Sequence, residues 1–503
     1  MAEEQKEQAA TTQAAAEESP LDALFSKVDL TPPSEAVNLE NQQQMESSSA
    51  KLSVAVNHFL HAIAASGQAV DKLDKVVVDQ AISEIDARLS NQIAAILHND
   101  QFQEMESNWR SLKFLVDRTD FRRNIKIDML NVSKQDIMDD FEDAPEPVQS
   151  GLYKQIYTME YDQPGGEPYG ALISSYEFGR GPQDIGLLQS LAKIAAATHC
   201  PFIGSAGPEM FGLKSVLDLP NVPDLASLFE QADYAKWNAF RESEDSRYIG
   251  LTVPRFLLRL PYGKDTTPVK EFDFEEDVTG AEHSKYLWGN ASFAFASRLT
   301  ESFAKNGWCV NIRGPQAGGL VEDLPLHLFQ AGGETETKIP TEILIPDRRE
   351  FEFAQQGFIP LSFYKNKNYA CFFSAQSVQR PKKYSTDEAT ANAKLSANLP
   401  YLFLVSRLAH YLKVIQRENI GAAKEADDLQ MELDDWISKL VTEMPNPGPE
   451  LKARCPLKSA SIKVEALADS PGFYRVTMKV RPHFQVEGVD VDLSLVSQMP
   501  KAK

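Results

Sequence analysis

The chain has 503 residues, of which 72 are acidic and 51 are basic, so its formal net charge is −21. A hydrophobic fraction of 43% with 24% charged residues predicts a soluble chain with a large core, divided into about three structural units. The acidic balance excludes a general nucleic-acid binder, because such proteins neutralise phosphates with lysine and arginine. It also argues against adhesion to an anionic membrane surface.

The sequence predicts neither a secretory signal nor a membrane-spanning helix. The first 20 residues have neither a basic region nor an apolar run, so we expect no secretory signal. The longest mostly apolar stretch, residues 54–65, falls short of the ~20 residues that a membrane-spanning helix needs. The four cysteines lie far apart, which suits a reducing compartment. We therefore expect a soluble, cytoplasmic protein.

Residues 1–45 are predicted to be a flexible acidic arm, since they offer little to bury. Residues 1–50 hold ten acids against Lys6 and Lys27, a local charge of −8. One short apolar island interrupts the arm and consists of Leu21, Leu24, Phe25, Val28 and Leu30. Composition leaves two interpretations of this island open: an inert linker, or a segment that orders against a partner.

Residues 46–120 are predicted to be helical, because apolar residues recur there every three or four positions. The stripes consist of Leu52, Val56, Phe59 and Ile63, then Val78, Ile82, Ile85, Leu89, Ile93 and Ile96, and finally Phe102, Met105, Trp109, Leu112 and Val116. They are narrow and have charged flanks, as in coiled coils. The helices either pack on one another or await helices of another subunit. The residues alone favour internal packing.

Strand-like and helical runs alternate over residues 121–380, which predicts a mixed α/β or α+β core. The strand-like runs include 125–132, and the clearest helices lie at 185–199 and 287–306. The last region, 381–503, begins with a long helical segment in which Pro400 marks a kink or a new first turn.

The C-terminal part of that region is predicted to be β-structure. Strands at 462–466 and 474–480 flank the turn 469–472 and predict a hairpin. A third strand is expected where Val489, Val491, Leu493 and Leu495 alternate with polar residues. Because natural proteins cover strand edges, this edge is expected to be covered within the subunit or completed by another chain.

No active-site motif assembles in this sequence. The loop 207–215 has one residue too many between Gly212 and Lys214 for a phosphate-binding loop. His58 and His61 share an apolar face without the cysteines or carboxylates that complete a metal shell. No spacing brings together a nucleophile, a base and an oxyanion donor. We predict no enzymatic activity, no metal and no cofactor.

One dense alternation of charges lies at residues 241–247. Such a run could position a general acid, but it is more often an ion-pair network or a solvated face. Arg241, Glu244, Asp245 and Arg247 are therefore predicted to form ion pairs within or between protomers.

Several long strings carry a specific resemblance to a known family. They are FRESEDSRYIGLTVPRFLLRLPYG at 240–263, EHSKYLWGNASFAFASRLTESFAKNGWC at 282–309, FFSAQSVQRPKKY at 372–384, AHYLKVIQRENIG at 409–421 and RPHFQ at 481–485. These strings resemble the large subunit of the type VI secretion contractile sheath, the TssC or VipB family. The match runs in consistent order from about Ser47 to Pro500.

The resemblance implies a structural and mechanical role. The family forms a helical sheath with a small sheath subunit (TssB or VipA) around an inner tube protein. The sheath assembles on a baseplate and contracts to drive the tube and its effectors into a target cell. A ClpV-like AAA+ unfoldase disassembles the contracted form. The resemblance further implies a core like that of contractile phage tail sheaths, a location in the bacterial cytoplasm, and neither nucleic-acid binding nor membrane insertion.

The resemblance also implies where assembly contacts lie. It implies a small-subunit interface at Leu52, Val56, Phe59, Ile82, Ile85, Leu89, Ile93 and Trp109. It implies an inter-protomer joint, built as a shared β-sheet, at Leu24, Phe25, Val28, Leu30, Val489, Val491, Leu493 and Leu495. The remaining alternative is a soluble α/β enzyme with an unrecognised active site.

Overall fold

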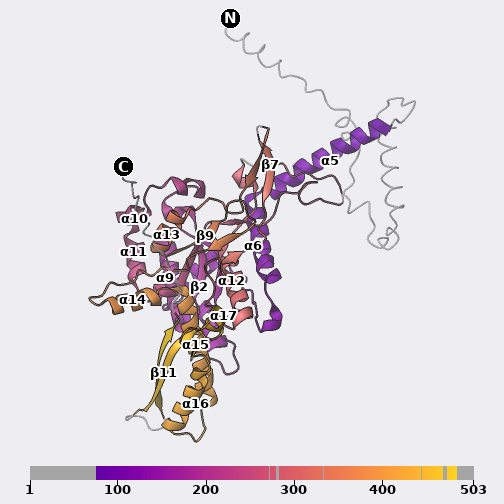
Figure 1. Cartoon of the computed structure of the whole chain (residues 1–503). Helices are drawn as coiled ribbons and strands as arrows, with labels where there is room; N and C mark the ends of the chain where they lie inside the picture. The colour runs from indigo at the N-terminus through magenta and orange to yellow at the C-terminus, as the bar shows by residue number, and fades with distance from the viewer. Residues whose placement is uncertain are drawn as a thin grey trace, which may run out of the picture. The chain divides into compact units, whose positions relative to one another are not determined.

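The computed structural model describes residues 75–270, 272–278, 282–331, 333–442, 444–467 and 473–483 (Figure 1). Contacts divide it into two units. The first contains α5 (Lys75–Leu97) up to Ala94 together with Pro268–Glu275, and the second contains the rest of the described chain. The predicted helix at 52–63, the island at 21–30 and the strand at 489–495 lie outside the described residues. The predicted domain boundary at residue 120 stays a prediction.

The second unit is a mixed α/β domain, as the sequence predicts. Its helices are α6 (Asp100–Asp117), α7 (Lys134–Asp143), α8 (Gly151–Tyr153), the π-helix η4 (Lys154–Tyr161), α9 (Pro182–Thr198), α10 (Leu225–Phe229), α11 (Ala235–Glu242), α12 (Ala291–Asn306), α13 (Asp347–Gln355), α14 (Asp387–Ser396), α15 (Leu399–Glu418), α16 (Ala426–Ser438) and α17 (Pro449–Arg454). Short 3-10 turns connect several of them.

A six-stranded sheet forms the centre of this unit, in the order β1-β2-β3-β9-β10-β6. Its strands are β1 (Leu172–Phe178), β2 (Phe202–Ala206), β3 (Ile249–Val253), β6 (Leu320–Val321), β9 (Phe358–Phe363) and β10 (Ala370–Phe372). β1, β2, β3 and β9 run parallel, whereas β10 is antiparallel to both β9 and β6. Smaller two-stranded sheets pair β4 (Phe256–Leu257) with β5 (Trp288–Gly289) and β7 (His327–Ala331) with β8 (Glu334–Lys338).

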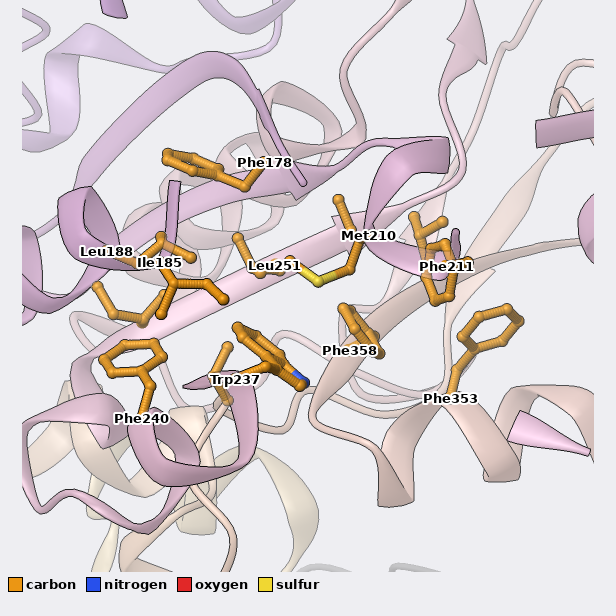
Figure 2. Close-up of a cluster of buried hydrophobic side chains, with 14 of the residues drawn as sticks. Phe178, Ile185, Leu188, Met210, Phe211, Trp237, Phe240, Leu251, Phe353 and Phe358 are labelled. Atoms are coloured by element: carbon orange, nitrogen blue, oxygen red, sulfur yellow. The ribbon is translucent and has the colours of Figure 1, made fainter. Parts of the chain in front are cut away.

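Helices cover both faces of the parallel strands, so these strands are apolar on both sides. Phe202 of β2 packs in one core cluster with helix α9, whereas the next residue, Ile203, packs in another with α12. Successive strand residues point to opposite faces. Figure 2 shows the α9 side, where Trp237 of α11 stacks on Phe358 of β9 with ring centroids 6.0 Å apart.

The C-terminal hairpin is confirmed. β11 (Leu457–Ala466) and β12 (Tyr474–Pro482) pair antiparallel over their length. Their apolar face packs with α15 and α16 in a separate core cluster, to which Leu408, Leu433 and Ile462 contribute. Figure 1 shows this hairpin beside α15 and α16.

Candidate assembly surfaces

An apolar stripe lies exposed on α5. Ile82, Ile85 and Leu89 have exposed fractions of 51%, 36% and 41%, and Ile93 is partly buried. On α6, in the second unit, Trp109 is 59% exposed, while Ser111 and Leu115 face the body of the domain. Large exposed apolar patches mark interaction sites in soluble proteins. Of the predicted small-subunit residues that the structure describes, Ile82, Ile85, Leu89 and Trp109 are therefore exposed within the described chain, and Ile93 is partly covered.

A buried ion network holds α6 in place. Arg259 donates from Nε to Glu106 Oε1 of α6 over 2.9 Å and from Nη1 to Glu276 Oε2 over 2.7 Å. His98, just before α6, lies 3.0 Å from Glu276 Oε1 through its Nε2. Buried charges of this kind are tolerated only when they are paired. The network therefore fixes the helix that displays Trp109.

The hairpin has one covered and one open edge among the described residues. Gln430 of α16 accepts a hydrogen bond from the Val464 backbone N–H over 2.8 Å and donates one to the Ile462 carbonyl over 2.7 Å. These two hydrogen bonds occupy the outer edge of β11. β12 pairs with β11 alone. Its outer edge therefore offers backbone groups to an added strand.

The solvent face of the hairpin is basic. The alternation of buried and exposed residues places polar side chains outward along both strands. The exposed basic side chains are Lys458, Lys463, Arg475, Lys479 and Arg481, against the exposed Glu465, which pairs with Lys463. This local excess of positive charge contrasts with the net charge of −21 of the whole chain.

A large cavity of about 1390 Å³ lies within the second unit. Its walls come from α6, the segment 124–132, β1, α12 and α15. The sequence predicts a strand at 125–132. The structure has no regular secondary structure there, and these residues join no sheet. Periodicity could not reveal the cavity, because its walls come from segments far apart in the sequence.

The ion-pair prediction for residues 241–247 is wrong for Arg241 within the described chain. Arg241 is 1% exposed, and its guanidinium donates to neutral oxygens: the Val378 carbonyl at 3.0 Å, Gln356 Oε1 at 2.9 Å and the Gln355 carbonyl at 3.1 Å. Burial, with a smaller effect of Arg380, lowers its pKa to about 9.

Within the described chain, Arg247 also contacts a neutral oxygen. Arg247 donates from Nε to the Glu244 carbonyl over 2.8 Å, not to a carboxylate. Arg241 binds other segments because its carbonyl partners converge from the loop before α14 and the end of α13. Ion pairing of Glu244, Asp245 and Arg247 between protomers stays a prediction.

Replacing Arg241 with methionine is expected to destabilise the domain by about 3 kcal/mol or more. The substitution leaves buried acceptors unsatisfied, each of which costs roughly 1–3 kcal/mol. Chemical denaturation followed by circular dichroism measures the change. The matched control is Arg247→Met, which removes a single hydrogen bond at the surface and should cost under about 1 kcal/mol. Equal effects of the two substitutions would contradict a structural role for Arg241.

The buried carboxylate of Glu342 has an unusually low pKa. Its Oε1 accepts from Arg255 Nη2 at 2.6 Å and lies 2.9 Å from His283 Nε2. Burial alone would raise the pKa, but the hydrogen bond from His283 and the charge of Arg255 outweigh it and lower the pKa to about 2.

Acid is therefore expected to remove a contribution of Glu342 to stability. A carboxyl group whose pKa falls from 4.5 to about 2 on folding stabilises fully above pH 4.5, and the effect is lost as the pH falls towards 2. Glu342→Gln should cost about 3 kcal/mol at neutral pH, and the difference from the wild type should shrink across that window. Denaturation curves at a series of pH values measure it; a difference that does not change with pH would contradict the assignment.

The loop 207–215 packs into the core, and no metal cluster occurs among the described residues. The loop 207–215 contains a short 3-10 helix (Pro208–Phe211), and Met210 and Phe211 are buried in the core (Figure 2). No group of histidine, cysteine and carboxylate side chains in the described ranges is arranged to hold a metal ion. His58 and His61 lie outside the described residues. No described helix has both the length and the apolarity needed to cross a membrane.

Comparison with known proteins gives strong matches over most of the chain. The VipB family model, described as EvpB/VC_A0108, tail sheath N-terminal domain, matches residues 79–379, and the VipB_2 model, described as EvpB/VC_A0108, tail sheath gpW/gp25-like domain, matches 388–499. The chain is 47% identical over 430 residues to the type VI secretion system sheath protein TssC1 of Pseudomonas aeruginosa, covering 85% of this chain and 86% of that protein.

Two solved structures are similar at low identity. The anti-feeding prophage baseplate has a chain 9% identical with a TM-score of 0.38, covering 75% of this chain and 84% of that chain. The anti-feeding prophage helical sheath in the contracted state has one 10% identical with a TM-score of 0.34, covering 70% and 76%.

The family matches and the relative define the class of this protein as a structural subunit of a contractile tail sheath. The chain belongs to the VipB (TssC) family of type VI secretion sheath proteins. The family, the sheath role and the mixed α/β core that the sequence predicts are thereby confirmed.

Proposed function

We propose that this chain assembles with a small sheath subunit into a helical tube around an inner tube protein, and that contraction of the sheath drives the inner tube and its effectors into a target cell. The observation that carries the proposal is the exposed stripe of Ile82, Ile85 and Leu89 on α5. Burial of each such side chain is worth roughly 1.5–3 kcal/mol. A partner helix laid along the stripe gains that energy, as in coiled coils.

Adjacent protomers are linked, in this proposal, through the C-terminal hairpin. The open edge of β12 receives an extended strand from a neighbouring copy, supplied by the island at Leu24, Phe25, Val28 and Leu30. The basic outer face of the hairpin and the arm's charge of −8 over residues 1–50 support this pairing. The strand Val489, Val491, Leu493 and Leu495 belongs to the same joint.

The remaining parts of the proposal concern how the sheath contracts, assembles and is recycled. The sheath performs mechanical work on contraction if the rigid cores of its subunits rotate while the strand linkers hold neighbouring subunits together. The sheath assembles on a baseplate in the bacterial cytoplasm, and a ClpV-like AAA+ unfoldase recycles it. The chain is not an enzyme. The family's structural role supports this reading over an α/β enzyme with an unrecognised active site.

Electron microscopy of the chain co-expressed with its small sheath subunit tests the proposal. Regular tubes are expected from the pair and not from the chain alone. The alternative, an enzyme, predicts a discrete particle with turnover of a small-molecule substrate and no polymer. A stable monomer that neither binds the small subunit nor polymerises would overturn the proposed function.

A further inference from the structure

Helix α15 links the central sheet to the C-terminal hairpin (Figure 1). At its start, Leu399 and Phe403 pack with strands of the central sheet. One position further on, Leu404 and then Leu408 pack with α16 and the hairpin instead. The helix is continuous, contains no glycine, and has its single proline in the first turn. A force on the hairpin therefore reaches the central sheet along this helix.

The second half of α15 is less buried than the first half. Its fully buried residues all lie at or before His410, and none of residues 411–418 is fully buried. The apolar residues of this half, Leu412 and Ile415, pack on the hairpin cluster. Helices curve where one side is open, because the hydrogen bonds on that side lengthen. This half therefore moves with the hairpin unless a second contact holds it to the core.

Two basic side chains supply a second contact. Lys413 Nζ lies 2.9 Å from Asp162 Oδ1 and 3.6 Å from the ring centroid of Tyr161. Arg417 donates to the Gln163 carbonyl over 2.8 Å and to the Tyr161 carbonyl over 3.1 Å. Hydrogen bonds from charged donors and a cation over an aromatic ring are stronger than neutral polar contacts. Together they tie the last two turns of α15 to the end of η4.

The end of η4 is itself fixed to the α/β core. Ile156 and Tyr161 of η4 are buried. The ring of Tyr161 contacts the ring of His199, the residue after α9, with centroids 6.4 Å apart. η4 packs on α9, which covers one face of the central sheet. At 1.5 Å per residue, Lys413 lies about 20 Å along α15 from its first residue, so the core holds this helix at two distant points.

We propose that Lys413 and Arg417 are positioning residues for contraction. They hold α15 at its second point, so that the pull of a neighbouring protomer on the hairpin turns the central sheet instead of bending the helix. This role rests on the proposed function, in which the hairpin is the joint between protomers. Neither residue belongs to the exposed stripe of α5 or to the open edge of β12. Assembly and contraction are therefore expected to depend on different residues.

A double variant separates contraction from assembly. Lys413→Met with Arg417→Met keeps long side chains but removes both charges. The full-length variant is expressed with the small subunit and the rest of the secretion apparatus. Electron microscopy should show tubes of wild-type length. Time-lapse fluorescence microscopy of a labelled small subunit should show that the fraction of sheaths that contract falls by about tenfold or more, since the unsupported helix absorbs the rotation.

Three further variants distinguish this role from a purely structural one. Lys413→Arg with Arg417→Lys keeps both charges and should contract within about twofold of the wild type. Gln416→Met with Glu418→Met changes exposed residues of the same turns and should contract equally well. Asp162→Asn removes the ion pair at a side chain that is 57% exposed, so the fold is kept, and the contracting fraction should fall by about threefold.

The outcomes separate this role from the proposed function. Normal contraction of the methionine double variant would overturn the inference and leave the proposed function standing. If that variant forms no tubes, Asp162→Asn decides: tubes that contract normally, or no tubes at all, overturn the inference, and tubes that contract less often support it. If the wild-type pair forms no tubes, the proposed function fails first.

Discussion

Replacing Ile85 and Leu89 with aspartate is expected to abolish co-purification of this chain with the small sheath subunit. The two side chains lie one turn apart on the exposed stripe of α5. Losing both apolar contacts removes roughly 3–6 kcal/mol of binding free energy, and a buried unpaired carboxylate costs more. The dissociation constant should therefore rise by a factor of about 100 or more. Affinity capture through a tag on the small subunit measures the effect.

The matched control places the same charges on the other side of the helix. Ala87 and Asn91 are exposed and have the same spacing, but they lie off the stripe. Ala87→Asp with Asn91→Asp should leave co-purification within about twofold of the wild type, since the charge stays in water. If the stripe variant still co-purifies normally, the small subunit does not bind there.

Deleting residues 1–30 is expected to block formation of sheath tubes without unfolding the chain. The deletion removes the island at Leu24, Phe25, Val28 and Leu30, which we propose adds a strand to β12 of a neighbour. Each backbone hydrogen bond contributes only about 0.5–1.5 kcal/mol net. One joint is weak, but repetition along a polymer makes the sum large. Electron microscopy should show soluble heterodimers with native circular dichroism and no tubes.

A shorter deletion separates the island from the rest of the arm. Removing residues 1–18 takes away much of the acidic start but keeps the island. Tubes should still form, with a weaker dependence on salt than in the wild type, because less of the joint then rests on charge attraction to the basic face of the hairpin, which salt screens. Tubes of normal length from the 1–30 deletion would remove the arm from the joint.

The sequence predicted a helix or strand correctly where the pattern of residues that defines it lies within one stretch of chain. The alternation in 462–466 and 474–480 predicted the hairpin, because side-chain direction in a strand has a period of two. The sequence left Pro400 at a kink or a first turn, and the structure places it in the first turn of α15, where its missing N–H is not needed. The helix expected at 287–306 begins at Ala291, since Trp288–Gly289 pairs as β5.

Pairing between distant segments was decided by the tertiary structure alone. The run 125–132 has a strand's pattern, yet it forms no regular secondary structure and no described segment pairs with it. Arg241 stands in a row of alternating charges, yet its partners come from positions 355, 356 and 378. Neither outcome is visible in a window of neighbouring residues, because burial and hydrogen bonding depend on which remote groups converge. The sequence by itself indicated the family, through the long strings that resemble it, and the apolar stripe on α5, through a spacing of three or four residues that follows the helix period. The cavity, the buried arginine and the open edge of β12 depended on the packing of the whole domain.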